Sequence, residues 1–196
     1  MDQTALIATF RRIILANELD NSLAHVHKFS DPDGVRSGKS GWSFGISQFD
    51  LKNNPIAAAC LRACGFSEAE IKGLIDQTIN ARALEPKLKA AAATIELFDQ
   101  AQLKGCVVRA QRILYKRAIT PANDSGLLAV ADYANQYHLS DILKPGYLIH
   151  YLFRLGRPFT AADVLQFKLA GTKYGREHPG DCRRRYENLM NIMDAA

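Results

Sequence analysis

One break in an otherwise helical pattern limits what this chain can fold into. Residues 28–53 contain SDPDG, RSGKSG and then SGWSFGISQFDL, whereas the sequence after Asn54 has the apolar spacing and end signals of helices. Clusters of glycine, proline, serine and aspartate of this kind mark turns. Phe44 and Ile46 alternate as in a strand, and Phe49 and Leu51 take the opposite parity. We therefore expect a small sheet or β-hairpin with a turn or bulge here.

The segments on either side of this break predict helices. In residues 4–27 the apolar side chains Leu6, Phe10, Ile13 and Ile14 recur three and four positions apart. Ser67 and Glu70 have the spacing of a capping box. Further helices are expected over 55–64, 68–80, 85–101, 106–118, 122–137, 145–155, 160–173 and 181–194. The predicted fold class is α+β, mostly α, with one small β-hairpin after the first helix, in a single domain over 1–196 that has room for two lobes.

The charge and composition of the chain limit the classes of partner that it is expected to bind. The chain has 196 residues, 47% of them apolar, and a net charge of +5. These values indicate a folded protein with an anionic partner, such as nucleic acid, a membrane surface or the bacterial cell wall, or simply a basic surface. The four cysteines show neither CxxC spacing nor a histidine at zinc-finger spacing, so we expect reduced core thiols and no metal. No stretch predicts a membrane span, and the first 20 residues lack the features of a secretory signal, so synthesis in the cytoplasm is expected.

Two groups of acids are candidates for catalysis. Glu18 follows Ile14 by four residues and so shares the apolar side of the first helix near its end. Partial desolvation there would raise its pKa and suit it to general-acid work, although helix geometry alone favours a solvated helix glutamate. Asp31, Asp33 and Asp50 lie in or just after the irregular segment. They could supply the second carboxylate of a glycosidase, or they could serve as turn residues and caps. Their spacing in the sequence does not distinguish between these two roles.

The order of these features resembles the lysozyme-like superfamily, above all goose-type lysozymes and soluble lytic transglycosylases. SFGISQFD (43–50) is similar to the goose-type "GFGLMQVD" segment, which forms one wall of the sugar cleft. Glu18 takes the place of the catalytic glutamate that ends a helix. AVADYANQY (129–137) is a weaker match to a later family helix whose tyrosine reaches the cleft, here Tyr133. The chain departs from the family in a longer gap after Glu18, in the leucine that follows it, and in Ser47 where methionine is usual.

The resemblance implies a lysozyme-like fold and a peptidoglycan-cleaving glycosidase without a cofactor. Glu18 would protonate the leaving oxygen of the β-1,4 bond between N-acetylmuramic acid and N-acetylglucosamine. If Asp33 or Asp50 activates a water, the product is hydrolysed; otherwise the muramic acid 6-hydroxyl attacks and leaves an anhydro end, as in lytic transglycosylases. The presence of Asp50 favours hydrolysis. The substrate-binding residues would be Trp42, Ser43, Phe44, Gln48 and Tyr133.

The expected partner is bacterial peptidoglycan, with no nucleic acid and no membrane span, and a monomer is expected. The features resemble a phage endolysin, which reaches the wall through a separate membrane pore (a holin), or a secretion-system effector. Two other classes stay open. One is a helical nucleic-acid-binding protein that uses basic helices such as 106–118, and the other is a lysozyme-like fold that only binds glycan. The arginine run 183–185 is expected on a solvated helix face, and Asp132 is expected only to pair with a base.

Overall fold

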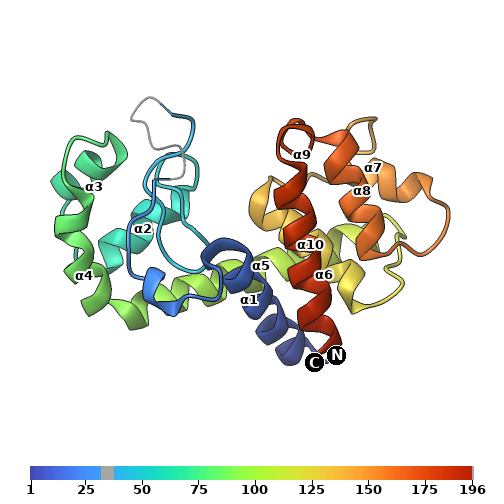
Figure 1. The fold of residues 1–196 in the computed structure, drawn as a ribbon, viewed down its shortest axis with the longest axis horizontal. Coiled ribbons are helices and arrows are strands. Elements are labelled where there is room, and N and C mark those ends of the chain that lie inside the picture. Colours follow the sequence, from blue (N-terminus) through green and yellow to red (C-terminus); the bar gives the residue numbers. More distant parts are fainter. Residues whose placement is uncertain (32–37, 196) are drawn as a thin grey trace. The chain divides into compact units, whose positions relative to one another are not determined.

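The computed structural model of the protein describes residues 1–31 and 38–195. Helices account for 66% of the chain, and no strand is present in the described ranges. The chain divides into two compact units, one formed by Met1–Asn17 with Leu103–Ala196 and the other by Glu18–Gln102. Two helices, α1 (Gln3–Leu19) and α5 (Ala92–Lys116), contribute residues to both (Figure 1). Each unit is described by itself.

The first helix, α1, forms where its apolar spacing predicts it. Phe10, Ile13 and Ile14 are fully buried, so one side of the helix belongs to a core. The helix ends at Leu19 because Asp20 and Asn21 adopt left-handed backbone conformations, with φ of 48° and 62°. Aspartate and asparagine tolerate this conformation better than most residues. The predicted helix over 4–27 is therefore too long, and a short 3-10 turn, Leu23–His25, follows instead.

The first unit is completed by the second part of α5 and by the C-terminal helices. Helices α6, α8 and α10 pack against one another, α7 lies against α8, and α9 contacts α8 and α10. Side chains cap two of them: Asn123 accepts from the backbone N–H of Gly126 on α6, and Thr160 with Asp163 forms a capping box on α8. The bounds are α6 (Asp124–Gln136), α7 (Leu148–Arg154), α8 (Ala161–Gly171), α9 (Lys173–Glu177) and α10 (Pro179–Asp194).

The second unit surrounds an aromatic and aliphatic core. Its elements are α2 (Pro55–Ala63), α3 (Glu68–Ile75), the 3-10 helix η2 (Ala81–Leu84), α4 (Glu85–Ala90) and the first part of α5. The predicted capping box of Ser67 and Glu70 is confirmed at the start of α3. That helix stops earlier than predicted because Gln77 has a φ of 53°. The two helices predicted over 85–101 and 106–118 are wrong: α4 ends at Ala90, and α5 then runs unbroken to Lys116.

The predicted β-hairpin is wrong, and the described part of the chain is all-helical with connecting turns. In the described residues around the Gly-rich segment, strand-like pairing is limited to one antiparallel bridge. In this bridge the backbones of Ser30 and Ser43 exchange N–H···O bonds of 2.9 and 2.7 Å. Beyond Ser43 the chain coils, because Gly45 has a φ of 77° and Gln48 a φ of 50°. Phe44, Ile46 and Phe49 are all fully buried, whereas a half-exposed strand would have alternated them. The α+β class is therefore corrected to all-α.

Candidate active site

Glu18 lies in the last turn of α1 and is half-buried. Leu19 beside it is 7% exposed, and Ile14 one turn earlier is fully buried. The sequence-based placement of Glu18 on the inner side of the helix near its end is therefore consistent with its burial. Its immediate neighbour, Asn17, is 4% exposed and belongs to the first unit, so this turn of α1 is where the two units join along the chain.

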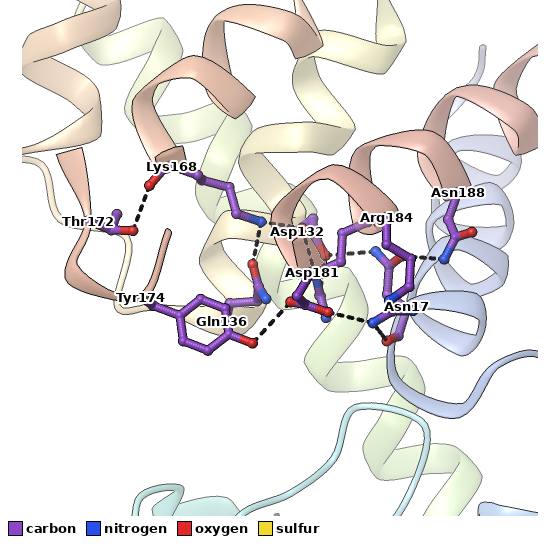
Figure 2. Close-up of polar contacts among 10 residues, drawn as sticks. Asn17, Asp132, Gln136, Lys168, Thr172, Tyr174, Asp181, Arg184 and Asn188 are labelled. Atoms are coloured by element: carbon purple, nitrogen blue, oxygen red, sulfur yellow. Dashed lines mark hydrogen bonds and ion pairs between the residues drawn. The ribbon is translucent and has the colours of Figure 1, made fainter. Parts of the chain in front are cut away.

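Asn17, near the end of α1, is held by polar side chains from α6 and α10, which are drawn in Figure 2. Its side-chain amide donates to Asp132 Oδ1 at 3.2 Å, and its side-chain oxygen accepts from Asn188 Nδ2 at 3.1 Å. Its backbone carbonyl accepts from Arg184 at 3.0 Å. Carbonyls in the last turn of a helix lack partners within the helix, and a basic side chain can satisfy them. The backbone at Asn17 is thus held by side chains of α6 and α10.

Asp132 is the centre of this network. It is 5% exposed and accepts hydrogen bonds from Arg185 and from Lys168, the latter at 3.3 Å, and both of these side chains are 4% exposed. Lys168 also donates to the side-chain oxygen of Gln136. Burial alone would raise the pKa of Asp132, but the charges of Arg185 and Lys168 hold it at about 2. The prediction that Asp132 pairs with a base is confirmed, whereas the prediction of a solvated arginine run is wrong for Arg185, which is a core residue.

The predicted sugar-facing segment, 43–50, is organised by an acid that sequence reasoning missed. Asp99 on α5 is completely buried, and its carboxylate accepts the backbone N–H groups of Ile46 at 2.9 Å and Ser47 at 2.8 Å. Consecutive N–H groups of a strand point to opposite edges, so their convergence on one carboxylate belongs to a turn and not to a hairpin. Burial raises the pKa of Asp99, while the two N–H donors act in the opposite direction. A signal was present in the sequence, because Asp99 falls four residues from both Ile95 and Leu103 and therefore on an apolar face.

Gln48 stabilises its own turn. Its side-chain Nε2 donates to the Gly45 carbonyl at 2.9 Å, and its Oε1 accepts from the Ser30 hydroxyl at 2.7 Å. The residue is half-buried, and the second amide hydrogen has no partner in the part of the chain that the structure describes. Gln48 therefore keeps one N–H donor for a ligand, and its Oε1 has a second lone pair that can accept another hydrogen bond.

The other predicted residues of this segment are mostly structural. Phe44 is fully buried and packs against Phe29 and Phe49, with ring centroids 5.8 and 5.6 Å away, so its ring lies in the core and offers no sugar-stacking face. Ser43 is 3% exposed and is committed to its bridge with Ser30. Trp42 is partly buried against the same aromatic cluster and retains an exposed part.

Asp50 organises the turn that follows. Its Oδ1 accepts the backbone N–H groups of Gly41, Lys52 and Asn53 at 3.1, 2.8 and 3.3 Å, and its Oδ2 accepts from the Asn53 side chain at 2.7 Å. This is the behaviour of a turn aspartate. Of the other two acids of the region, Asp31 accepts from Gln77 Nε2 at 3.4 Å, and Asp33 lies outside the described residues.

Tyr133 falls in the first unit, whereas Glu18 and the 42–50 segment fall in the second. It is half-buried on α6 and packs against Tyr137 and Phe167, with centroid distances of 4.7 and 6.0 Å. Burial raises the pKa of its hydroxyl. The assignment of Tyr133 to a sugar cleft stays a prediction.

The basic residues of the 106–118 segment are largely engaged within the fold. Arg109 donates to the Leu139 carbonyl at 2.9 and 2.6 Å, and Lys116 and Arg117 both pair with Asp141. These contacts hold the segment that follows α6, at Leu139 and Asp141, against α5. Of the alternatives left open by the sequence, these contacts favour a structural role over an anion-binding one.

The cysteines and the possible metal-ligating side chains were the other candidates for a functional site. All four cysteines are free thiols, and burial raises the pKa of each. Across residues 1–31 and 38–195 there is no group of three or more histidine, cysteine or acidic side chains that could hold a metal ion. Within the same ranges, none of the helices combines the length and apolar character needed to cross a membrane.

Comparison with known proteins adds no relative. No protein-family model, no curated protein and no solved structure matches the chain.

Proposed function

We propose that the chain is a peptidoglycan-cleaving glycosidase in which Glu18 is the general acid. The observation that carries this proposal is the place of Glu18: it is a half-buried residue in the last turn of α1, directly after Asn17, which is held by Asp132, Asn188 and Arg184. General-acid catalysis needs a proton donor at a defined place relative to the leaving oxygen, and a partly buried helix end meets that need.

The 43–50 turn supports a sugar-binding role in the same unit. Asp99 and Gln48 fix its backbone, and Gln48 keeps one amide hydrogen for an N-acetyl carbonyl or a hydroxyl of the glycan. Trp42 supplies the exposed aromatic surface that Phe44 does not.

One observation favours the transglycosylase route as a second candidate. Both oxygens of Asp50 already accept hydrogen bonds from the turn around it, so this carboxylate is poorly suited to activate a water. Hydrolysis then depends on Asp33. Without it, the muramic acid 6-hydroxyl would attack the reacting carbon and leave an anhydro end.

Mass spectrometry of purified peptidoglycan digested by the wild-type protein separates these outcomes. Reducing muropeptides are expected from a hydrolase, and products lighter by one water from a transglycosylase. Asp50→Asn should preserve the product type, since we assign Asp50 to the turn. Absence of any soluble product would contradict the enzyme proposal and favour a protein that only binds glycan or nucleic acid.

In this proposal the wall is the partner, and the protein acts on it after release through a membrane pore, as an endolysin does, or through a secretion system. The helical nucleic-acid-binding alternative loses support from the contacts of Arg109, Lys116 and Arg117, which are used inside the fold.

A further inference from the structure

The first unit contains a pocket that has no part in the proposed reaction. It encloses about 430 Å³ between α7 and α8 and the turn at Pro145 and Gly146. Pockets of roughly 300–1,000 Å³ hold small organic ligands in other proteins. The volume is therefore large enough for a short peptide or a molecule of similar size.

The pocket has an aromatic wall. Phe167 is 5% exposed and stands 5.5 Å from Tyr151 between ring centroids, with the rings tilted by 42°. Gly171 at the end of α8 lets the Phe167 ring pack against the backbone: a Cβ there would lie 2.8 Å from that ring, closer than a side chain can approach. The wall suits methyl groups and other small apolar parts of a ligand.

The rim of the pocket is basic. His150 and Arg154 lie four residues apart on one face of α7, and Gln166 comes from α8. None of the described residues that line the pocket is acidic. Within the described ranges, the Arg154 guanidinium forms no hydrogen bond or ion pair. Arg157, three residues later, is instead paired with Asp163 at 2.7 Å. The rim is thus a cationic, hydrogen-bonding edge beside an apolar wall.

We propose that this pocket binds the carboxylate end of a short peptide, with Arg154 as the main contact. A guanidinium binds a carboxylate through two parallel hydrogen bonds, Gln166 can bond a peptide group, and the aromatic wall can contact alanine-sized side chains. The identity of this peptide rests on the proposed function. It is the stem peptide that peptidoglycan carries on its muramic acid, and this stem ends in D-alanine. The pocket would hold the wall by this peptide.

Calorimetric titration tests this site with a probe that has no glycosidic bond. N-acetyl-D-Ala-D-Ala should bind the wild-type protein, and the same peptide amidated at its C-terminus should bind about tenfold more weakly or not at all, because a charge-assisted hydrogen bond is lost. Arg154→Ala should weaken binding of the free acid to a similar degree. Arg157→Ala, which removes an arginine already paired with Asp163, is the matched control and should bind as wild type does.

Three results would overturn the proposal: no binding of the free acid, equal binding of acid and amide, or equal binding of inorganic phosphate and the peptide. Circular dichroism spectra of both arginine variants establish that they are folded. The outcome is independent of cleavage, because the probe cannot be cleaved. A chain that digests peptidoglycan without binding the probe would retain the proposed function and lose this site.

Discussion

Gly45 determines the backbone path of the 43–50 turn. It has a φ of 77°, and a Cβ at this position would lie 3.1 Å from both carboxylate oxygens of Asp99 and from the Phe49 ring. Gly45→Ala should therefore lower the free energy of unfolding by roughly 3 kcal/mol, from backbone strain together with crowding in the core. Urea unfolding followed by circular dichroism measures the loss.

Gly65 provides the matched control for that substitution. Its φ of 82° is similar, but nothing lies within 4 Å of the position of its Cβ. Gly65→Ala should lose only the conformational part, about 1 kcal/mol. Equal losses in the two variants would mean that Asp99 and Phe49 do not constrain the turn.

At the scale of single residues the sequence was informative about which positions matter and less so about what they do. Glu18 could be placed on a helix because its spacing from Ile14 is local. The roles of Phe44 and Asp50 could not be predicted, because Phe44 depends on Phe29 and Asp50 on Gly41, and these contacts form only when the loop closes. The local pattern places Asp99 on an apolar face of a helix, but it could not identify Ser47, 52 residues away, as the partner of its carboxylate.

Helices α1, α6, α8 and α10 are joined through Asp132, which makes this residue the clearest test at the scale of elements. Asp132→Asn leaves Lys168 and Arg185 buried without a neutralising carboxylate. Breaking a buried ion pair in this way costs about 3–5 kcal/mol. Asp76→Asn is the control, since Asp76 pairs with an exposed Lys72 on the surface and should leave stability almost unchanged.

The same network predicts a pH dependence. Arg185 and Lys168 hold the pKa of Asp132 at about 2 in the folded chain, against an ordinary value of 3.8. The folded state therefore favours the carboxylate, and its contribution is complete above pH 3.8 and lost as the pH falls toward 2. Wild type should lose stability across this window, and Asp132→Asn should lose less. Parallel curves for the two proteins would contradict the pairing.

Elements were predicted best where the signals were local. The capping box at Ser67 and the proline at the start of α2 mark real helix starts. The hairpin was predicted wrongly because the alternation of Phe44 and Ile46 continues as a coiled turn, in which Asp99 takes the N–H groups of Ile46 and Ser47. The gap predicted between 101 and 106 was wrong because Gly105 is tolerated inside the long helix α5.

For the molecule as a whole, a net charge of +5 predicts attraction to anionic wall polymers. Raising the salt concentration from about 0.1 M to about 1 M shortens the screening length from about 10 Å to about 3 Å. Sedimentation of the protein with purified walls should therefore decrease over this range. Binding that does not change with salt would mean that charge contributes little to wall attachment.

Duplex DNA in the same titration tests the competing class of function. A nucleic-acid-binding protein should bind it tightly at low salt and lose affinity steeply as salt rises, roughly in proportion to the phosphates contacted. We expect weak binding, because Arg109, Lys116 and Arg117 are engaged within the fold. The division into two units could not be read from composition, because it rests on contacts between distant segments such as α1 and α10.

The rate of peptidoglycan cleavage by Glu18→Gln is the most direct test of the central claim. Removing a general acid typically costs a factor of about 100 to 10,000, so soluble muropeptides should nearly disappear while the circular dichroism spectrum stays the same. Glu68→Gln makes the same chemical change at an exposed glutamate of the same unit and should cleave at the wild-type rate. Equal cleavage by wild type, Glu18→Gln and Glu68→Gln would contradict the assignment of Glu18 as the acid.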